Sequence, residues 1–318
     1  MSSPETTAPE RPRISVVIPH LNQPAMLDRC LASLDIGTRA PDEVVVADNG
    51  SEVLPEAICA RYPFVRLIRE ATPGPGPARN AGIARTSGDI LAFIDADCVA
   101  DPGWLAAAEA EILMPGTTVL GGDVRIHYAN PARLTLLEAY ESIYAYRMDR
   151  YIARDNFTGT GNLVMKRAVF EDVGPFAGLS VAEDIDWGKR ATAKGYRIRY
   201  VAGMRVYHPA REKFGELCTK WDRHTAHFFE GVRGNPKRMA LWALKCCAMA
   251  LSPIAELPQI ATSDRVSGLR SRILALAGLI RIRLYRARIM AWLLFGGDPD
   301  RLSGRWNRPA QAAPAKQD

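Results

Sequence analysis

The fold class of this chain can be inferred from one segment, Ile90-Leu91-Ala92-Phe93-Ile94-Asp95-Ala96-Asp97. Its run of five apolar residues is short, rich in β-branched and aromatic side chains, and preceded by a Gly-Asp turn. This pattern predicts a buried strand. Two carboxylates then stand two residues apart at the carboxyl end of that strand, where open α/β sheets bind their ligands. Such hard oxygen ligands suit Mg²⁺ or Mn²⁺, which can bridge to nucleotide phosphates. The alternative is a plain turn, because Asp is common after strands.

Further strands alternate with helices at short spacing before this segment. Strands are expected over residues 13–19, 43–47 and 64–68. Between the first two lies a helical stripe of apolar residues at positions i, i+3, i+4 and i+7, namely Leu27, Cys30, Leu31 and Leu34. A loop rich in Gly and Pro, residues 72–77, leads into a helix start at 78–84. The alternation predicts an α/β unit with a mostly parallel sheet.

A series of motifs in this order resembles glycosyltransferase family 2. The motifs are Ser15-Val16-Val17-Ile18-Pro19 with Asn22; Val46-Ala47-Asp48-Asn49-Gly50-Ser51; Ala78-Arg79-Asn80-Ala81-Gly82; Asp95-Ala96-Asp97; Gly161-Asn162-Leu163-Val164-Met165-Lys166-Arg167 with Val173-Gly174-Pro175-Phe176; and Glu183-Asp184-Ile185-Asp186-Trp187 with Arg190, Gly195-Tyr196 and His208. The resemblance covers roughly Ile14 to His208. It implies a GT-A fold, a Rossmann-like, mostly parallel sheet flanked by helices, with a C-terminal helical extension. It also implies an inverting, metal-dependent transferase that uses a nucleotide-diphosphate sugar.

The resemblance places the nucleotide-sugar at the ends of the first strands. Pro19 and Asn22 would contact the nucleoside, and Asp48 would accept a hydrogen bond from the imide N–H of uracil or thymine. UDP or dTDP is therefore expected rather than GDP, although many relatives carry a second Asp where this chain has Asn49. Arg79 and Asn80 begin a helix, where a cation and the helix N-terminus could meet phosphate or ribose. Alternatively, Arg79 only pairs with an acidic neighbour.

The resemblance also distributes the metal roles. Asp97 would be the direct ligand of Mn²⁺ or Mg²⁺, and Asp95 would contact ribose or a water on the metal. His208, placed after an expected strand at 196–201, would be a further ligand. A lone His is more often structural, so that alternative stays open.

Glu183 and Asp184 are expected to begin a helix. Neighbouring carboxylates in a partly buried site raise one another's pKa, which suits a general base, but two acids can also simply complement the helix dipole. The resemblance favours Asp184 as the base, with Glu183 orienting the acceptor and Asp186 as a support paired with Arg190.

Charge is unevenly distributed along the chain. Residues 200–318 hold 20 Lys and Arg against 9 Asp and Glu, whereas the remainder holds 21 against 26. From 269 to 294 two apolar stripes are separated by one Arg ridge and flanked by another; the ridges are Arg270, Arg281 and Arg288, and Arg272, Arg283 and Arg286. Such a helix can pack one face on its own protein and offer the other to an anionic membrane. The alternative is an ordinary packed helix with solvated Arg edges.

The apolar segment 241–260 is broken by Lys245, Pro253, Glu256 and Pro258, and so predicts an interfacial helix rather than a transmembrane span. The expected location is therefore cytoplasmic, peripheral on the inner face of the plasma membrane. A lipid-linked or saccharide acceptor in bacterial polysaccharide or glycolipid assembly is the matching partner.

Four regions are expected: a disordered tail over 1–11, the glycosyltransferase domain over 12–208 with its nucleotide-sugar half ending near 100, a basic helical region over 209–296, and a flexible tail over 297–318. The six cysteines show no metal spacing and predict reduced core thiols. A dinucleotide-binding dehydrogenase is excluded because Gly74-Pro75-Gly76-Pro77 lacks a third glycine and loses N–H donors to its prolines. The remaining rival is a non-catalytic protein that binds a nucleotide-sugar or nucleic acid, although no nucleic-acid partner is expected.

Overall fold

The computed structural model describes residues 11–179 and 181–303, which form two compact units. The first unit comprises residues 11–127 and Tyr146–Pro209, and the second comprises Tyr128–Ala145 and residues 210–303. Segment 128–145, which the sequence placed within the range 12–208, groups with the C-terminal helices. Most of the two predicted tails lies outside the described residues.

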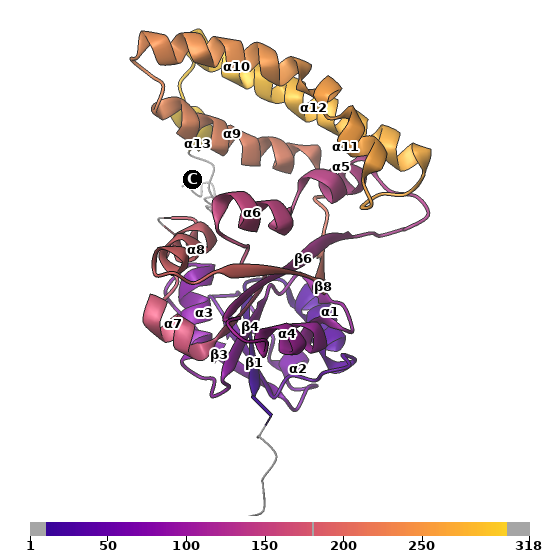
Figure 1. Cartoon of the computed structure of the whole chain (residues 1–318), viewed down its shortest axis with the longest axis vertical. Coiled ribbons are helices and arrows are strands. Elements are labelled where there is room, and N and C mark those ends of the chain that lie inside the picture. Colours follow the sequence, from indigo (N-terminus) through magenta and orange to yellow (C-terminus); the bar gives the residue numbers. More distant parts are fainter. Residues whose placement is uncertain (1–10, 180, 304–318) are drawn as a thin grey trace, which may run out of the picture. The chain divides into compact units, whose positions relative to one another are not determined.

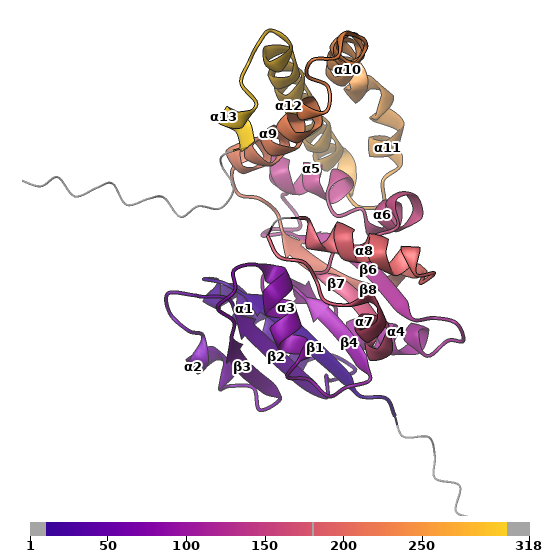
Figure 2. The same cartoon turned by 90° about the vertical axis from the view of Figure 1, so that its left-hand side faces the viewer.

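The first unit is built on one eight-stranded sheet. Its strands are β1 (Ile14–His20), β2 (Glu43–Asp48), β3 (Val65–Arg69), β4 (Ile90–Ile94), β5 (Val99–Ala100), β6 (Val119–His127), β7 (Asn162–Lys166) and β8 (Ile198–Pro209). They run in the order β3-β2-β1-β4-β7-β6-β8-β5. The run from β3 to β7 can be followed in Figure 2, and Figure 1 shows the same sheet from another side. The first four pair in parallel, β7 runs antiparallel to β4 and β6, and β8 is parallel to β6. The four strands expected from the sequence are confirmed to within about two residues.

Helices cover both faces of this sheet because its strands are apolar on both sides. One face packs against α1 (Pro24–Asp35), α2 (Glu56–Cys59) and α4 (Trp104–Ile112), and the other against α3 (Pro75–Ile83), α7 (Arg167–Val173) and α8 (Glu183–Ala193). Val16 and Ile18 belong to the first layer and Val17 to the second, as the period of two requires. Each such fully buried aliphatic side chain contributes about 1.5–3 kcal/mol. Figure 2 shows α3, α7 and α8 on one side of the sheet.

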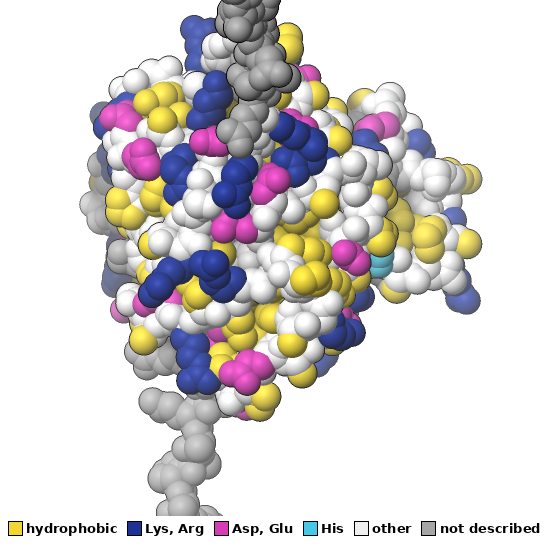
Figure 3. All heavy atoms as spheres, turned by 90° about the horizontal axis from the view of Figure 1, so that it is seen from below, with side chains coloured by type: hydrophobic (Ala, Val, Ile, Leu, Met, Phe, Trp, Pro, Cys, Tyr) yellow, Lys and Arg dark blue, Asp and Glu magenta, His cyan; other side chains and the backbone are white. Residues whose placement is uncertain are grey.

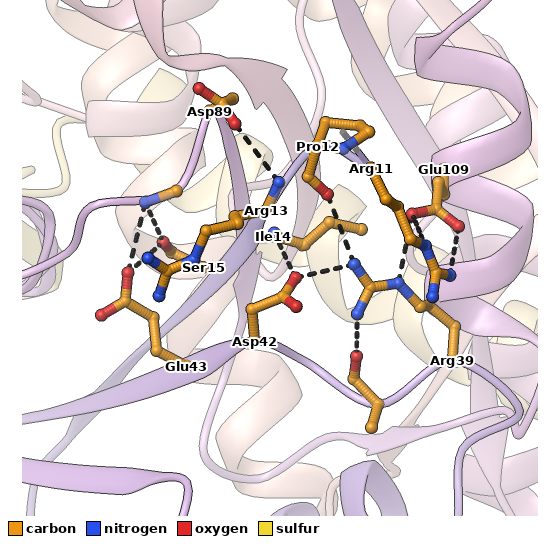
Figure 4. Close-up of polar contacts among 12 residues, drawn as sticks. Arg11, Pro12, Arg13, Ile14, Ser15, Arg39, Asp42, Glu43, Asp89 and Glu109 are labelled. Carbon is orange, nitrogen blue, oxygen red and sulfur yellow. Dashed lines mark hydrogen bonds and ion pairs between the residues drawn. The ribbon is translucent and has the colours of Figure 1, made fainter. Parts of the chain in front are cut away.

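Polar contacts close the amino end of the strands (Figure 4). The buried guanidinium of Arg39 donates to Asp42 at 2.7 Å and to Glu109 at 3.2 Å, and Arg11 also contacts Glu109, at 2.6 Å. Asp42 in turn accepts from the backbone N–H of Ile14 at 2.7 Å. On the face seen in Figure 3, Lys and Arg lie interspersed with Asp and Glu. The Arg side chains at the amino end of the strands are thus paired with carboxylates, and these contacts hold the strand ends and neighbouring loops together.

The second unit is helical. It contains α5 (Leu136–Tyr144), α9 (Phe214–Glu230), α10 (Pro236–Ala255), α11 (Leu257–Thr262), α12 (Gly268–Leu294) and α13 (Asp300–Ser303). A capping box between Thr135 and Glu138 starts α5. Gly278 allows α12 to approach α5, since a Cβ there would lie 2.8 Å from Cβ of Tyr140. The indole N–H of Trp242 donates to the carbonyl of Met290 at 3.0 Å and fastens α10 to α12.

The predicted two-faced character of α12 is seen in the structure. Its inner stripe, including Leu279 and Ile282, is buried against the unit, whereas Ile273 and Leu284 are 56% and 51% exposed. On α10, the apolar side chains most exposed are Leu244, Leu251 and Ile254. By length and composition alone, the stretch Pro236–Thr262 could cross a membrane. It is apolar on average, and few of its residues are buried.

The Arg ridges of α12 differ from the expectation. Arg272 donates to the carbonyls of Ile260 and Ser263, and Arg283 contacts Glu256 at 3.4 Å. Arg281 and Arg286 lie over aromatic rings, at 4.0 Å from the ring centroid of Phe214 and 3.5 Å from that of Trp221. These guanidinium groups bind their own unit, so they do not form a continuous ridge turned to lipid. The helical pattern shows which face is polar, but carbonyls and rings from other helices decide where each Arg goes.

Candidate active site

The carboxyl ends of β1 and β2 meet through a buried pair, His20 and Asp48. The imidazole Nδ1 of His20 lies 2.9 Å from Oδ2 of Asp48, and Oδ1 accepts from the backbone N–H groups of Gly50 and Ser51 at 3.1 and 3.0 Å. Burial opposes ionisation of Asp48, but the bonds from Ser51, His20 and Gly50 outweigh it and lower its pKa. Both carboxylate oxygens are thus engaged within the protein, which the sequence did not predict.

An open pocket of about 590 Å³ lies beside this pair. It is lined by Asp48, Gly50, Ser51, Glu52, Val53, Leu54, Glu56, Arg69, Glu70 and Ala71. Acceptor groups predominate in this lining, with Arg69 as its one cation. The volume and the acceptors suit a nucleoside, whose base and ribose present N–H and O–H donors.

Two asparagines organise the loops around the pocket. Asn49 donates to the carbonyls of Glu70 and Thr72 at 3.1 and 2.8 Å and accepts from the N–H of Gly74 at 2.6 Å. Asn22, at a positive φ of 53°, accepts from the N–H of Glu52 at 2.9 Å. An Asp at position 49 could not make the two donor contacts, so the departure from the family pattern has a structural reason here. Pro19 lies part-buried within β1.

Arg79 on α3 joins two acidic segments. Its guanidinium donates to Asp95 at 2.5 Å and to Glu183 at 3.1 Å, while its Nε is buried without an acceptor among the described residues. The predicted alternative, pairing with acidic neighbours, is therefore what the structure shows. Gly161 lies against the same carboxylate, because a Cβ there would be 2.4 Å from Oδ2 of Asp95. Desolvation raises the pKa of Asp95 against the opposing charge of Arg79, with Asp97 adding to the rise.

Asn80 has a structural position. Its amide donates to the carbonyl of Phe176 at 2.8 Å and accepts from the N–H of the same residue at 2.9 Å. Both ends of the amide are engaged, so Asn80 holds the segment around Phe176 against α3. The nucleotide contact that the resemblance implied for Asn80 stays a prediction.

Asp97 and His208 face one another. Oδ2 of Asp97 lies 3.3 Å from Nε2 of His208, whose Nδ1 is 2.7 Å from the carbonyl of Pro209. The hydroxyl of Tyr146 lies 3.1 Å from the same Nε2. Burial opposes protonation of His208, but Asp97 outweighs it and raises the pKa of the imidazole. Burial likewise opposes ionisation of Asp97, and the hydrogen bond with His208 lowers its pKa.

His208 stands within β8 rather than beyond a strand that ends near 201. The strand continues to Pro209 because it pairs with β6 on both sides of a register shift at Gly122/Asp123. Pairing with β6 resumes after the register shift, so β8 continues to Pro209. The imidazole of His208 thereby comes next to the D-x-D segment at the end of β4.

The donor set fits a divalent metal that also binds a diphosphate. Within residues 11–179 and 181–303, no three His, Cys, Asp or Glu side chains form a metal site on their own. Asp97 and His208 nevertheless supply a carboxylate oxygen and an imidazole nitrogen that lie 3.3 Å apart. The contact of Nδ1 with Pro209 would leave Nε2 as the ligating atom, as metal-bound histidines are commonly oriented. Mg²⁺ and Mn²⁺ are often held by one or two protein ligands together with substrate phosphates.

Glu183 and Asp184 begin α8, as predicted, and differ in their partners. Glu183 contacts Arg79, whereas Asp184 accepts from the N–H of Ile185, at 2.8 Å, and has no ion pair with a described residue. Burial raises the pKa of Asp184, and the charge of Glu183 adds to the rise while the Ile185 N–H and Arg79 oppose it. Asp186 pairs with Arg190 at 2.9 Å, as expected. An unpaired carboxylate with a raised pKa can accept a proton.

Sequence reasoning missed three members of this region. His20 follows the first strand but has no motif of its own, and Gly161 was quoted without its closeness to Asp95. Tyr146 lies at an unusual positive φ of 50° with its ring 4.5 Å from that of His208. No local sequence pattern predicts the position of Tyr146, because the surrounding structure imposes its backbone conformation.

The family model described as Glycosyl transferase family 2 matches residues 15–174. Glycosyltransferase AglE of Haloferax volcanii is 36% identical over 217 residues, which cover 66% of this chain and 70% of that protein. The pre-mycofactocin glycosyltransferase of Mycobacterium tuberculosis is 26% identical over 227 residues, covering 67% of this chain and 46% of that protein.

Among solved structures, the mannosyltransferase PcManGT from Pyrobaculum calidifontis, in complex with GDP-Man and Mn²⁺, matches with a TM-score of 0.54. The match covers 92% of this chain and 91% of that one at 18% identity. At this identity the likeness concerns the fold, and it shows the GT-A architecture predicted above.

Proposed function

The chain belongs to glycosyltransferase family 2, and on this premise we propose that it moves a sugar from a nucleotide-diphosphate donor to an acceptor hydroxyl with inversion at the anomeric carbon. One observation carries the proposal. Arg79 contacts both Asp95 and Glu183, so the D-x-D segment and the start of α8 lie around the same guanidinium. Groups for a metal and a diphosphate are thereby close to a candidate base.

Each region has a role in this proposal. The pocket beside Asp48 takes the nucleoside, with uracil or thymine as the base that the resemblance implies. Asp97, His208 and Asp95 lie where a Mn²⁺ or Mg²⁺ would be held with the diphosphate. Mn²⁺ accompanies the donor in the Pyrobaculum enzyme, which supports that choice. When bound, such a cation supplies charge that stabilises the departing diphosphate.

The proposed reaction is a single displacement. The acceptor oxygen forms a bond to the anomeric carbon on the face opposite the diphosphate, the bond from that carbon to the diphosphate oxygen breaks, and the hydroxyl proton passes to Asp184. Its raised pKa suits this transfer, because a base with a pKa nearer neutrality is still ionised yet accepts a proton more readily than an ordinary carboxylate. Glu183, held by Arg79, orients the acceptor.

A peripheral position on an anionic membrane, on the cytoplasmic face, is part of the proposal. Its support is the exposed apolar surface of α10, where Leu244, Leu251 and Ile254 are 66%, 66% and 69% exposed. Apolar helix faces rimmed by Lys and Arg bind the interfacial region of bilayers. Such a surface would bring the enzyme to a lipid-linked acceptor.

Vesicle co-sedimentation tests the membrane part of the proposal. Leu251→Glu with Ile254→Glu should release the protein from vesicles of phosphatidylglycerol while nucleotide binding is unchanged. Ile36→Glu, an equally exposed apolar site in the first unit, is the control. Equal pelleting of the double variant and the wild type would contradict the assignment.

A panel of nucleotides tests the donor and the metal together. Thermal unfolding is measured with UDP, dTDP, GDP and their sugars, with and without Mn²⁺, since a ligand that binds only the folded state raises the melting temperature. We expect stabilisation by a nucleoside diphosphate that depends on Mn²⁺. GDP belongs in the panel because guanine also carries a ring N–H. Stabilisation by random DNA, lost at high salt and without a nucleotide effect, would favour the binding-protein rival.

A further inference from the structure

Helix α9 carries a basic face that its own unit neutralises only in part, since His227 lies 4.0 Å from Glu230. Lys220, His224 and His227 follow one another at spacings of four and three residues, which places them on one side of the helix. Neither Lys220 nor His224 has an ion pair with a described residue. Burial lowers the pKa of Lys220, and the charges of Arg211 and Arg223 add to this while Glu141 opposes it. Glu141 itself is engaged by Arg211.

Arg286 of α12 extends this basic face. Helices α9 and α12 contact one another within the second unit (Figures 1 and 2). The guanidinium of Arg286 lies 3.5 Å from the ring centroid of Trp221, whose ring is 5.6 Å from that of His224. Its Nε is buried without an acceptor, and the side chain has no ion pair with a described residue. Burial, with Arg283 nearby, lowers the pKa of Arg286 to about 10.

Lys220 and Arg286 are half-buried, His224 is exposed, and the guanidinium of Arg286 lies over Trp221, so these groups remain accessible to a ligand. A buried charge without a partner loses its hydration and gains nothing in return, so such groups are normally paired. The other Arg residues of α12 near this position show the normal solution, since Arg272 binds carbonyls and Arg283 contacts Glu256. Lys220 and Arg286 have no carboxylate partner among the described residues, although Arg286 lies over the ring of Trp221. Their arrangement is complementary to an anion with several oxygen acceptors, and Arg in particular matches phosphate.

We propose that Lys220, His224 and Arg286 form a phosphate-binding site, and that its ligand is the phosphate of an acceptor carrying an apolar chain. The claim that the ligand carries an apolar chain rests on the proposed function and on the exposed apolar stripes of α10 and α12 in the same unit, which suit such a chain. Trp221 supplies a flat surface that holds the guanidinium plane in place. The site thus selects an acceptor by its charged end.

Isothermal titration on the full chain tests the site with three probes: farnesyl phosphate, farnesol and inorganic phosphate. We expect farnesyl phosphate to bind, farnesol not to bind, and inorganic phosphate to compete weakly. Arg286→Gln should weaken farnesyl phosphate by about ten-fold or more, as expected for loss of a charge-assisted contact. Arg288→Gln is the matched control, since Arg288 is exposed on the same helix and makes no hydrogen bond or ion pair with a described residue.

Stability separates a ligand site from a packing role. Because neither side chain has a carboxylate partner among the described residues, Arg286→Gln and Lys220→Gln should change the melting temperature of the free protein little, apart from the lost contact of Arg286 with Trp221, while losing the stabilisation by farnesyl phosphate. A lowered melting temperature with unchanged affinity would overturn the proposal. Farnesol binding as tightly as farnesyl phosphate would also overturn it, and so would inorganic phosphate binding as tightly, because the chain would then contribute nothing.

The outcome is independent of the nucleotide test. Binding of nucleoside diphosphate with Mn²⁺ should persist in Arg286→Gln, because that residue belongs to the second unit. Nucleotide binding without farnesyl phosphate binding would refute only this site, and the reverse would refute the donor assignment. Anionic vesicles that pellet the wild type and Arg286→Gln equally, with no difference in farnesyl phosphate affinity, would assign the cations to general membrane attraction and overturn the site.

Discussion

Replacing Asp184 by Asn tests the assignment of the general base. The amide keeps the shape of the carboxylate, and its oxygen can still accept from the N–H of Ile185, now 2.8 Å from Oδ1. It cannot take up a proton. Because Asp184 has no ion pair with a described residue, we expect the free energy of unfolding to change by less than about 1 kcal/mol.

The effect on rate is expected to be much larger. A positioned general base contributes about 10²–10⁴-fold, which corresponds to about 3–5 kcal/mol of activation free energy. The loss should lie in kcat, because the nucleoside pocket and the pair Asp97–His208 are formed by other elements. The dissociation constant for nucleoside diphosphate with Mn²⁺ should therefore stay at its wild-type value.

Glu183→Gln is the matched control on the adjacent residue. Glutamine keeps an oxygen toward Arg79 but removes the negative charge, so the ion pair at 3.1 Å becomes a hydrogen bond from a cation to a neutral amide. We expect a loss of about 1 kcal/mol in unfolding free energy and a smaller loss of rate than for Asp184→Asn. The two variants thus separate removal of a proton acceptor from loosening of the Arg79 contacts.

The assay measures release of nucleoside diphosphate from the donor that the nucleotide panel identifies. Hydrolysis, in which water replaces the acceptor, suffices when the acceptor is unknown. Near-normal turnover by Asp184→Asn would refute the reasoning. A larger loss in Glu183→Gln, at unchanged stability, would move the base to Glu183.

Three further outcomes are expected. Asp97→Ala should abolish the Mn²⁺-dependent part of nucleoside diphosphate binding while thermal unfolding stays cooperative, and unchanged affinity in calorimetry would sink the metal assignment. Asn49→Asp should lower the free energy of unfolding by about 2 kcal/mol, since two donor hydrogen bonds of about 1 kcal/mol each are lost, and denaturant titration would show no shift if the loop contacts were unimportant. The acidic limb of the pH–rate profile should lie above the range of an ordinary Asp, because activity is lost as pH falls through the raised pKa of Asp184; a limb at the ordinary position, or one that persists in Asp184→Asn, would contradict this.

Local sequence was sufficient for the parts of the site that lie at element ends. The run Ile90–Ile94 is apolar on both faces, so it had to be a buried strand, and the Asp pair after it had to emerge at the carboxyl edge. The same holds for Glu183 at the start of α8, where acids in the first turn complement the helix dipole. These predictions depend on periodicity and on strand and helix ends, which act over a few residues.

Contacts between distant segments could not be obtained in this way. Arg79 had two alternatives in sequence, and only the approach of β4 and α8 to α3 shows that it pairs with Asp95 and Glu183. His208 reaches Asp97 because β8 continues along β6 through a register shift, a property of the pairing and not of either strand alone.

The sequence by itself determined the alternation of strands and helices up to Ile94, the burial of the strand Ile90–Ile94 on both faces and the residues that follow it, because hydrophobic periodicity and turn residues specify these locally. Only the tertiary structure decided which carboxylate has an ion pair, with Glu183 bound by Arg79 and Asp184 left as the candidate proton acceptor. It also decided which arginines of α12 bind carbonyls or a carboxylate, and that Arg286 instead lies over the ring of Trp221. Charge pairing depends on atoms brought together from distant parts of the chain, and no spacing within one segment encodes those distances.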